Sequence, residues 1–154
     1  MISQTAEYAL RAMVFLAMKE GAATGQEIAA VTLVPGGYLS KIMQQLAKAK
    51  LVHSQRGIGG GFILARQAEE ISILDIVNAV DPIKHIRSCP LDIKSHGVNL
   101  CPLHARLSTA SRQVEEAFAK STLAELINES RSPDCVSVPL TPRATDTACG
   151  DCPL

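Results

Sequence analysis

The spacing of apolar residues along the chain predicts a mainly α-helical protein. In residues 4–19, apolar side chains recur every three or four positions, which predicts an amphipathic helix capped by Ser3 and ended near Gly21. A shorter helix is predicted over residues 25–31, because Thr24 is a residue type that caps helix N-termini. The expected apolar face of the first helix is Ala6, Leu10, Met13, Val14 and Ala17.

A third helix follows the break at TLVPGGY and runs to about Ala49. One side of this helix is apolar and is expected to pack inward: Leu39, Ile42, Met43 and Leu46. The other side offers polar, basic and aromatic groups: Tyr38, Ser40, Lys41, Gln44, Gln45 and Lys48. The helix therefore has one face for a core and a second face for solvent or a partner.

Two short strands are predicted next, over residues 51–55 and 62–65. The stretch RGIGGG between them supplies glycines for the positive φ angles that a hairpin tip requires. A phosphate-binding loop is excluded, because no Lys-Ser/Thr pair follows the glycines and no helix opens directly after them.

The second half of the chain holds the remaining helices. We expect a helix over residues 72–80 with Ser72 as its cap, a long helix over 102–120, and a short helix over 122–129 with Ser121 as its cap. The apolar stripe of the long helix is Leu103, Leu107, Ala110, Val114, Ala117 and Phe118. A small N-terminal domain cannot cover this whole stripe, so a second copy of the chain is the simplest partner.

Composition adds a charge asymmetry to this picture. The chain has 154 residues, no net charge and only 3% aromatic residues, so its core must be built from aliphatic side chains. Residues 1–66 hold seven Lys/Arg against three Asp/Glu, which leaves a net charge of +4 on the N-terminal part. Such a basic part favours an anionic partner. Neither a signal peptide nor a membrane-spanning run is present, so we expect a cytoplasmic protein with no membrane partner.

Three helices followed by a two-stranded hairpin is the order of a winged helix-turn-helix, which reads double-stranded operator DNA. The polar face of the third helix can then reach base edges and phosphates in the major groove. Arg56 lies at the turn of the hairpin, where an arginine can enter a narrow minor groove. The neighbouring glycines, Gly59 among them, let the backbone approach the duplex closely.

The predicted fold class is therefore mainly α with a small β-wing: a winged helix-turn-helix plus a long dimerisation helix. Four segments follow from this organisation. They are a DNA-binding domain over residues 1–82, a sensor loop over 83–101, a dimerisation helix with a short following helix over 102–129, and a mobile tail with cysteines and prolines over 130–154.

The cysteine positions favour metal or thiol chemistry. The five cysteines are an odd number in a chain without a secretion signal, which argues against a disulfide framework. Cys101 precedes Pro102 and is expected at the N-cap of the long helix, where the helix dipole favours the thiolate. His104 lies in the first turn of that helix, and the loop is long enough to return Cys89 to it. This donor set suits a [2Fe–2S] cluster better than a [4Fe–4S] cluster.

Several stretches make the chain resemble the IscR/NsrR/CymR (Rrf2-type) family of winged-helix transcriptional regulators. They are YALRAM, YLSKIMQQLAKAKLV, RGIGGGFILAR, ISILDIVNAVD and TLAEL, and the resemblance covers about residues 1–129. It implies a homodimer with an N-terminal winged helix. By similarity, the residues that contact the major groove are Tyr38, Ser40, Lys41 and Gln44, and Arg56 contacts the minor groove.

The resemblance also implies an iron–sulfur cluster, because many family members hold one on evenly spaced cysteines before the dimerisation helix. The first and last of these cysteines correspond to Cys89 and Cys101, and the histidine added in IscR-like members corresponds to His104. The middle position is Ser95, whose hydroxyl is a poor iron ligand.

A further ligand is needed to complete such a set. His96 is adjacent to the middle position and can substitute for it. Some family members take an additional ligand from the first helix of the partner subunit, and Glu7 is the residue that corresponds to it here. The next turn of that helix offers only Arg11, which cannot ligate iron.

Taken together, these features predict a dimeric repressor, not an enzyme, whose operator affinity is controlled by a cluster that senses redox state, nitric oxide or iron supply. The same dimer without a cluster, controlled by thiol oxidation or a partner protein, is the alternative. Structural zinc and an inert loop are further interpretations of the cysteines. A CxxC at Cys149 and Cys152 raises a different class, a thiol-redox or metal-binding protein that binds no DNA, although its place in a tail argues against catalysis.

Overall fold

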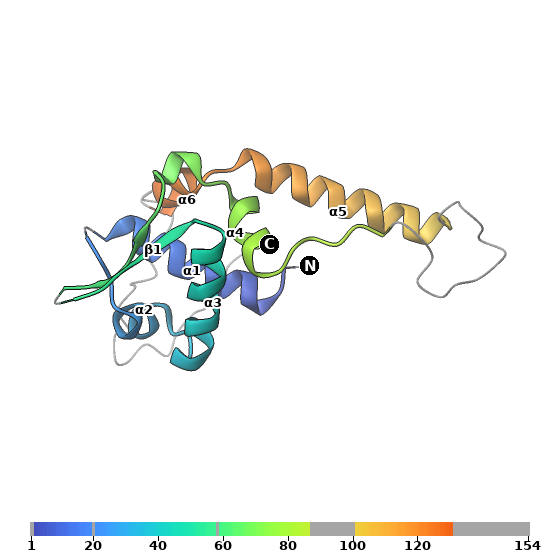
Figure 1. Cartoon of the computed structure of the whole chain (residues 1–154). Coiled ribbons are helices and arrows are strands. Elements are labelled where there is room, and N and C mark those ends of the chain that lie inside the picture. The colour runs from blue at the N-terminus through green and yellow to red at the C-terminus, as the bar shows by residue number, and fades with distance from the viewer. Residues whose placement is uncertain (1, 20, 58, 87–100, 131–154) are drawn as a thin grey trace, which may run out of the picture.

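The computed structural model describes residues 2–19, 21–57, 59–86 and 101–130 (Figure 1). Its elements in chain order are α1 (Gln4–Met18), α2 (Gly25–Thr32), α3 (Gly36–Lys48), β1 (Val52–Gln55), β2 (Gly61–Leu64), the 3-10 helix η1 (Ala68–Glu70), α4 (Ile73–Val80), α5 (Pro102–Lys120) and α6 (Leu123–Ser130). This mainly helical fold with a two-stranded wing confirms the predicted fold class. Among the described helices, none combines the length and apolarity that crossing a bilayer requires.

Helix α1 lies at the centre of the fold, because it contacts α2, α3, α4, α6 and β2 (Figure 1). Its fully buried side chains are Ala6, Ala9, Ala12, Met13 and Leu16. The apolar face predicted from the sequence packs inward, since Leu10, Val14 and Ala17 are half-buried against the core. The buried surface is wider than predicted, because a helix enclosed by five elements buries small alanines on several sides.

Helix α3 follows the sequence pattern closely. Its four predicted core residues, Leu39, Ile42, Met43 and Leu46, are all at most 1% exposed. Each such side chain contributes about 1.5–3 kcal/mol on burial. This inward face fixes which residues of α3 point outward.

The wing consists of β1 and β2, which pair antiparallel with Val52 opposite Leu64. A third segment joins them, since Ala23 both donates to and accepts from the backbone of Phe62, at 3.0 and 2.7 Å. The loop between α1 and α2 thus anchors the wing to the helices. The local sequence pattern does not predict this bridge, because its two residues lie far apart in the chain.

Gly61 is the residue that permits this close approach. A Cβ atom at Gly61 would lie 2.3 Å from the backbone oxygen of Ala23. We therefore expect Gly61→Ala to lower the free energy of unfolding by about 1–3 kcal/mol, the usual cost of overpacking. Gly37→Ala is the matched control in urea denaturation, because a Cβ there meets nothing within 4 Å. An unchanged midpoint for Gly61→Ala would contradict the close packing of this bridge.

Helix α6 returns the chain to the N-terminal helices, where it contacts α1 and η1. The backbone N–H of Ile73 donates to Ser121, and that of Leu123 donates to Ile71, at 2.9 and 2.8 Å. The cap of α6 is Thr122, whose hydroxyl accepts from the Glu125 N–H. The prediction that Ser121 caps this helix is wrong, because the chain leaves α5 at Ser121 and turns before α6 begins.

Helix α5 extends away from the remaining elements, which together form the body (α1–α4, the wing and α6) (Figure 1). Residues 82–86 run back along α5 toward its first turn, at the end farthest from the body (Figure 1). His85 Nε2 lies 2.7 Å from Glu115 Oε2 and links this segment to α5. His85 thus has a structural role in this contact.

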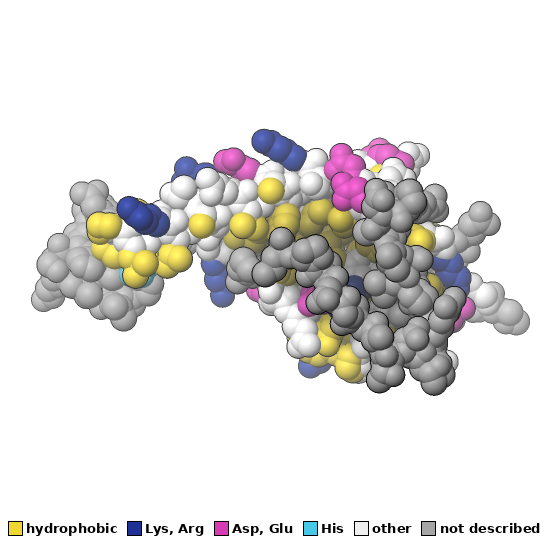
Figure 2. Space-filling model, turned by 180° about the vertical axis from the view of Figure 1, so that it is seen from behind, with side chains coloured by type: hydrophobic (Ala, Val, Ile, Leu, Met, Phe, Trp, Pro, Cys, Tyr) yellow, Lys and Arg dark blue, Asp and Glu magenta, His cyan; other side chains and the backbone are white. Residues whose placement is uncertain are grey.

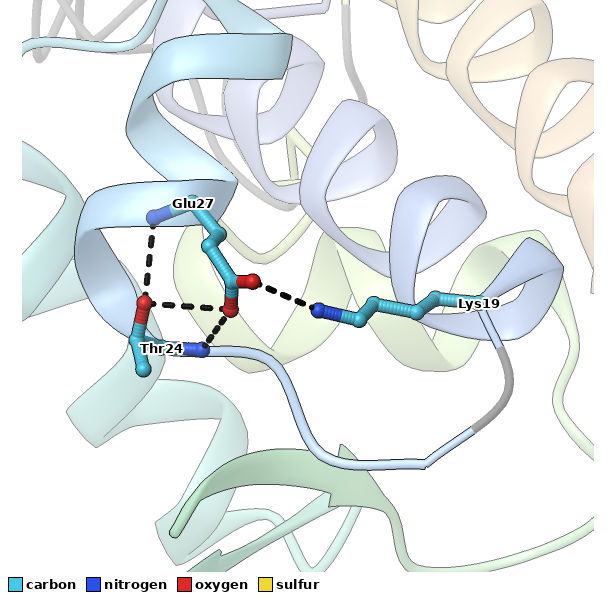
Figure 3. Close-up of polar contacts among 3 residues, drawn as sticks. All are labelled: Lys19, Thr24 and Glu27. Atoms are coloured by element: carbon cyan, nitrogen blue, oxygen red, sulfur yellow. Dashed lines mark hydrogen bonds and ion pairs between the residues drawn. The ribbon is translucent and has the colours of Figure 1, made fainter. Parts of the chain in front are cut away.

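A capping box at the start of α2 holds Glu27 (Figure 3). The Thr24 backbone N–H donates to the Glu27 carboxylate at 2.7 Å, and Lys19 Nζ donates to it at 2.9 Å. These hydrogen bonds, that of the Thr24 backbone first, lower the pKa of Glu27 from 4.5 to about 2. The folded chain therefore stabilises the ionised carboxylate.

This lowered pKa makes stability depend on pH. The contribution of Glu27 is fully present above about pH 4.5 and is lost as the pH falls toward about 2. We expect Glu27→Gln to be less stable than the wild type at pH 7, with a difference that shrinks as urea denaturation is repeated at lower pH. Glu69→Gln, at an exposed position of η1, is the control. A difference that stays constant with pH would contradict this assignment.

Candidate DNA interface and sensor site

The outward face of α3 carries the polar row that the sequence predicts. Opposite its buried face, the helix exposes Lys41, Gln44, Gln45 and Lys48. Two lysines and two amides on one helix face suit phosphate oxygens and base edges in a major groove. These residues form one row, because positions three and four apart on a helix share a face.

Two other predicted DNA contacts have hydroxyls that already bind within the protein. The Tyr38 hydroxyl shares a hydrogen bond of 2.7 Å with Thr5 Oγ1, and its ring meets that of Tyr8 edge to face. The Ser40 hydroxyl donates to the Gly36 carbonyl at 3.1 Å. Both residues remain exposed on α3. Nothing in the sequence around Thr5 or Tyr8 indicates that either residue contacts Tyr38.

A groove of about 560 Å³ separates α2 from α3 on the same side of the molecule. Its walls include Gln26 and Ala29 from α2, and Ser40 and Gln44 from α3. Gln44 thus stands at the edge of a concave surface, with α2 behind it.

The wing presents Arg56 on an exposed turn, as the sequence predicts. Gly57 and Gly59 adopt positive φ angles of 106° and 76°, which L-amino acids with side chains rarely adopt. The described part of the hairpin tip thus exposes glycine backbone beside the Arg56 guanidinium. Residue 58, between the two glycines, lies outside the described residues.

Cys101 occupies the N-cap of α5, with Pro102 at the first helical position, as the sequence predicts. Its Sγ lies 3.2 Å from His104 Nδ1. The Cys101 side chain makes no capping hydrogen bond to a backbone N–H of α5. A thiol and an imidazole therefore converge at the start of α5. In the described part of the chain, no cluster of three or more His, Cys, Asp or Glu residues is suited to a metal ion.

The other proposed ligands of the sensor loop cannot be placed. Cys89, Ser95 and His96 lie outside the described residues. The same holds for the three cysteines beyond α6, Cys135, Cys149 and Cys152.

Glu7 lies on α1, where Arg11 donates to its carboxylate one turn later. The Glu7 side chain is 54% exposed and so accessible from outside the chain. Helix α1 belongs to the body, whereas the turn with Cys101 and His104 lies at the far end of α5 (Figure 1). Within one chain, Glu7 therefore does not join these two donors.

The apolar stripe of α5 is exposed except at Phe118, which is half-buried against the body. Leu103, Leu107 and Val114 are 63%, 47% and 39% exposed, and no residue of α5 is fully buried. Figure 2 shows hydrophobic side chains along this helix and continuing onto the body. Contiguous apolar surface of this kind marks an interaction site.

Comparisons with known proteins agree with this geometry. The family model described as Rrf2, iron-dependent transcriptional regulator, matches residues 2–129. The IscR regulator of Serratia proteamaculans is 30% identical over 129 residues, which cover 82% of this chain and 79% of that protein. The solved structure of IscR from T. potens has a TM-score of 0.71 and 26% identity, covering 85% and 88% of the two chains. CymR, the global cysteine regulator of B. subtilis, has a TM-score of 0.69 and 25% identity, covering 84% and 97%.

Proposed function

This chain belongs to the Rrf2 family of transcriptional regulators, and we propose that it is a dimeric repressor whose operator affinity is controlled by an iron–sulfur cluster. The family and the structural neighbours are DNA-binding regulators and not enzymes. The proposal extends this common function to the signal, the cofactor and the assembly. Membership of a family of DNA-binding regulators argues against the class alternative, a redox protein that binds no DNA.

The observation that carries the proposal is the pair of donors at the start of α5. A thiol and an imidazole 3.2 Å apart fit the mixed Cys/His ligation that iron–sulfur clusters accept. Cys101 would bind iron as its thiolate. Cys89 would supply the second thiolate, with [2Fe–2S] favoured over [4Fe–4S]. A bound cluster supplies a group that changes charge on oxidation and reacts with oxidants or nitric oxide.

One further ligand would complete this set, because Ser95 replaces a thiolate in the sequence pattern. His96 is the ligand within the same loop. Glu7 of the partner subunit is the alternative, supported by its exposed carboxylate and by the distal position of the α5 tip. Arg11 would have to release Glu7 before that carboxylate could bind iron. A partner ligand would tie the cluster directly to the dimer.

Homodimerisation is supported by the exposed stripe on α5. Leu103, Leu107 and Val114 on one protomer would pack on the same residues of the other, as a two-fold interface requires. Two recognition helices would then face two half-sites of an operator. Because the sensor turn and the dimer stripe share α5, a change at the cluster can alter half-site geometry and hence DNA affinity.

The same dimer without a cluster, controlled by thiols or a partner protein, is a second candidate. The departure at Ser95 favours it, because the ligand set within the loop is short of one thiolate. The likeness to CymR, a cysteine regulator, also supports it. In this candidate, Cys89 and Cys101 would form a reversible disulfide.

DNA reading is tested with the outward row of α3. We expect Gln44→Ala to lower affinity for a selected duplex by about 1–3 kcal/mol and to relax base preference, because an amide that pairs with a base edge is lost. Lys41→Ala is expected to weaken binding to all sequences and to reduce the salt slope by about 1. Fluorescence anisotropy with a duplex selected from a random pool measures both effects.

The matched controls remove a glutamine and a lysine side chain outside α3. Gln67→Ala and Lys120→Ala change exposed residues outside α3 and are expected to leave affinity unchanged. Equal losses in the control and α3 variants would show that α3 does not read the duplex.

A further inference from the structure

We propose that Thr5 is a positioning residue for the recognition helix: it holds Tyr38 in place and thereby sets the first turn of α3 against DNA. The proposal rests on the DNA-reading part of the proposed function. It concerns α1, a helix to which no DNA-reading role has been assigned above. It also changes the role expected for Tyr38, from a direct reader to a tie between two helices.

The contacts form a connected chain from α1 to α3. Thr5 Oγ1 and the Tyr38 hydroxyl are 2.7 Å apart. The rings of Tyr8 and Tyr38 have centroids 5.9 Å apart and planes at 80°, the edge-to-face arrangement that aromatic pairs prefer. Gln4 Nε2 donates to the Tyr8 hydroxyl at 2.8 Å. Thr5 and Tyr8 in the first turns of α1 thus contact Tyr38 of α3, and Gln4 holds the Tyr8 hydroxyl.

The first turn of α3 needs such a tie. Its N-cap is Pro35, which makes no side-chain capping hydrogen bond. Gly36 and Gly37 follow, and glycine is a poor helix former because it loses much conformational freedom. Additional Cβ atoms there would meet nothing within 4 Å, so a side chain at these two positions would not pack against the rest of the protein. Tyr38 is the first residue of the helix with a side chain, and that side chain is held by Thr5 and Tyr8.

This turn is also the part of a recognition helix that matters most for base reading. N-terminal residues of such helices contact base edges in the major groove. Fraying of residues 36–38 would displace Lys41 and Gln44 from their register with the duplex. The Tyr38 hydroxyl, bound to Thr5, thus contributes to recognition by fixing this register and not by a hydrogen bond to a base.

Isosteric variants separate the positioning role from direct contact. Thr5→Val and Tyr38→Phe each remove one side of the hydrogen bond, and the double variant removes both. The measurement is the ratio of affinities for a duplex selected by the wild type and a scrambled duplex of the same composition. We expect each single variant to lower this ratio about three- to tenfold, the size of one net hydrogen bond, and the double variant to lower it no further.

Two further readouts exclude a merely structural effect. Thr5→Ser keeps the hydroxyl and is expected to keep the wild-type ratio. Hydrogen exchange at the amides of residues 38–40 is expected to quicken in Thr5→Val, whereas affinity for the scrambled duplex stays unchanged. A general loss of folding would lower binding to both duplexes.

Specific outcomes would overturn the inference. A lowered ratio in Tyr38→Phe with an unchanged ratio in Thr5→Val would show that the Tyr38 hydroxyl binds DNA itself. Additive losses, or no loss in either single variant, would show that the two hydroxyls are not coupled in recognition. A wild-type protein that selects no sequence from the pool would overturn both this inference and the proposed function.

Discussion

Replacing Leu107 with glutamate is expected to convert the proposed dimer to a monomer and to lower affinity for a two-half-site operator by about two to four orders of magnitude. Leu107 lies in the exposed apolar stripe of α5 and is 47% exposed in a single chain. In the proposed dimer, a glutamate there would place two unpaired charges in an apolar interface. The body of each chain should remain folded, because Leu107 is outside its core clusters.

Analytical ultracentrifugation and anisotropy on the selected duplex measure the two effects. Thr109→Glu is the matched control, since it adds the same charge two positions along, on a different side of α5. This control should remain a dimer with wild-type affinity. A Leu107→Glu protein that still sediments as a dimer would place the interface elsewhere.

Replacing Cys101 with alanine is expected to remove bound iron and sulfide completely. The thiolate would be lost from the donor pair with His104, and a cluster needs its sulfur ligands. The change should leave α5 intact, because the Cys101 side chain makes no capping hydrogen bond. The loss of iron can then be assigned to ligation and not to unfolding of the helix.

Iron and sulfide analysis of anaerobically purified protein measures this effect, with visible absorption beside it. Cys149→Ala, in the segment after α6, is the control and should keep its iron. Retention of iron by Cys101→Ala would remove this cysteine from the ligand set. A response to oxidant that persists without iron, and that needs Cys89 and Cys101, would support the thiol-controlled alternative.

Local signals in the sequence predict most of the helices correctly. Ser3, Thr24 and Ser72 each cap the helix that the sequence assigns to it, because a capping side chain acts within three residues of its own position. Pro102 likewise marks the start of α5, since proline suits the first helical position. The α5 boundaries and the wing follow from such short-range rules.

Contacts between distant segments are not predictable in this way. The Ala23–Phe62 bridge and the Thr5–Tyr38 hydrogen bond join residues whose neighbours give no sign of the pairing. The prediction of the α6 cap was wrong for a related reason. Ser121 and Thr122 are both good caps, and only the path of the chain out of α5 decides between them.

In the candidate site, too, the contacts within one helix were predictable and the contacts between separate segments were not. The approach of Cys101 and His104 was predictable, because positions three apart share a face at the start of a helix. The outward row with Lys41 and Gln44 was predictable from the periodicity of α3. The completion of the ligand set was not, because it depends on His96 of the loop or on Glu7 of a second subunit.

One measurement tests directly whether a bound cluster controls DNA affinity. The protein is purified anaerobically, its iron and sulfide are determined, and its affinity for the selected duplex is measured before and after removal of the iron. We expect a coloured protein that contains iron and sulfide and whose affinity changes at least about tenfold, about 1.4 kcal/mol and within the range of typical allosteric couplings. A colourless, iron-free protein, or one whose affinity is the same with and without iron, would contradict it.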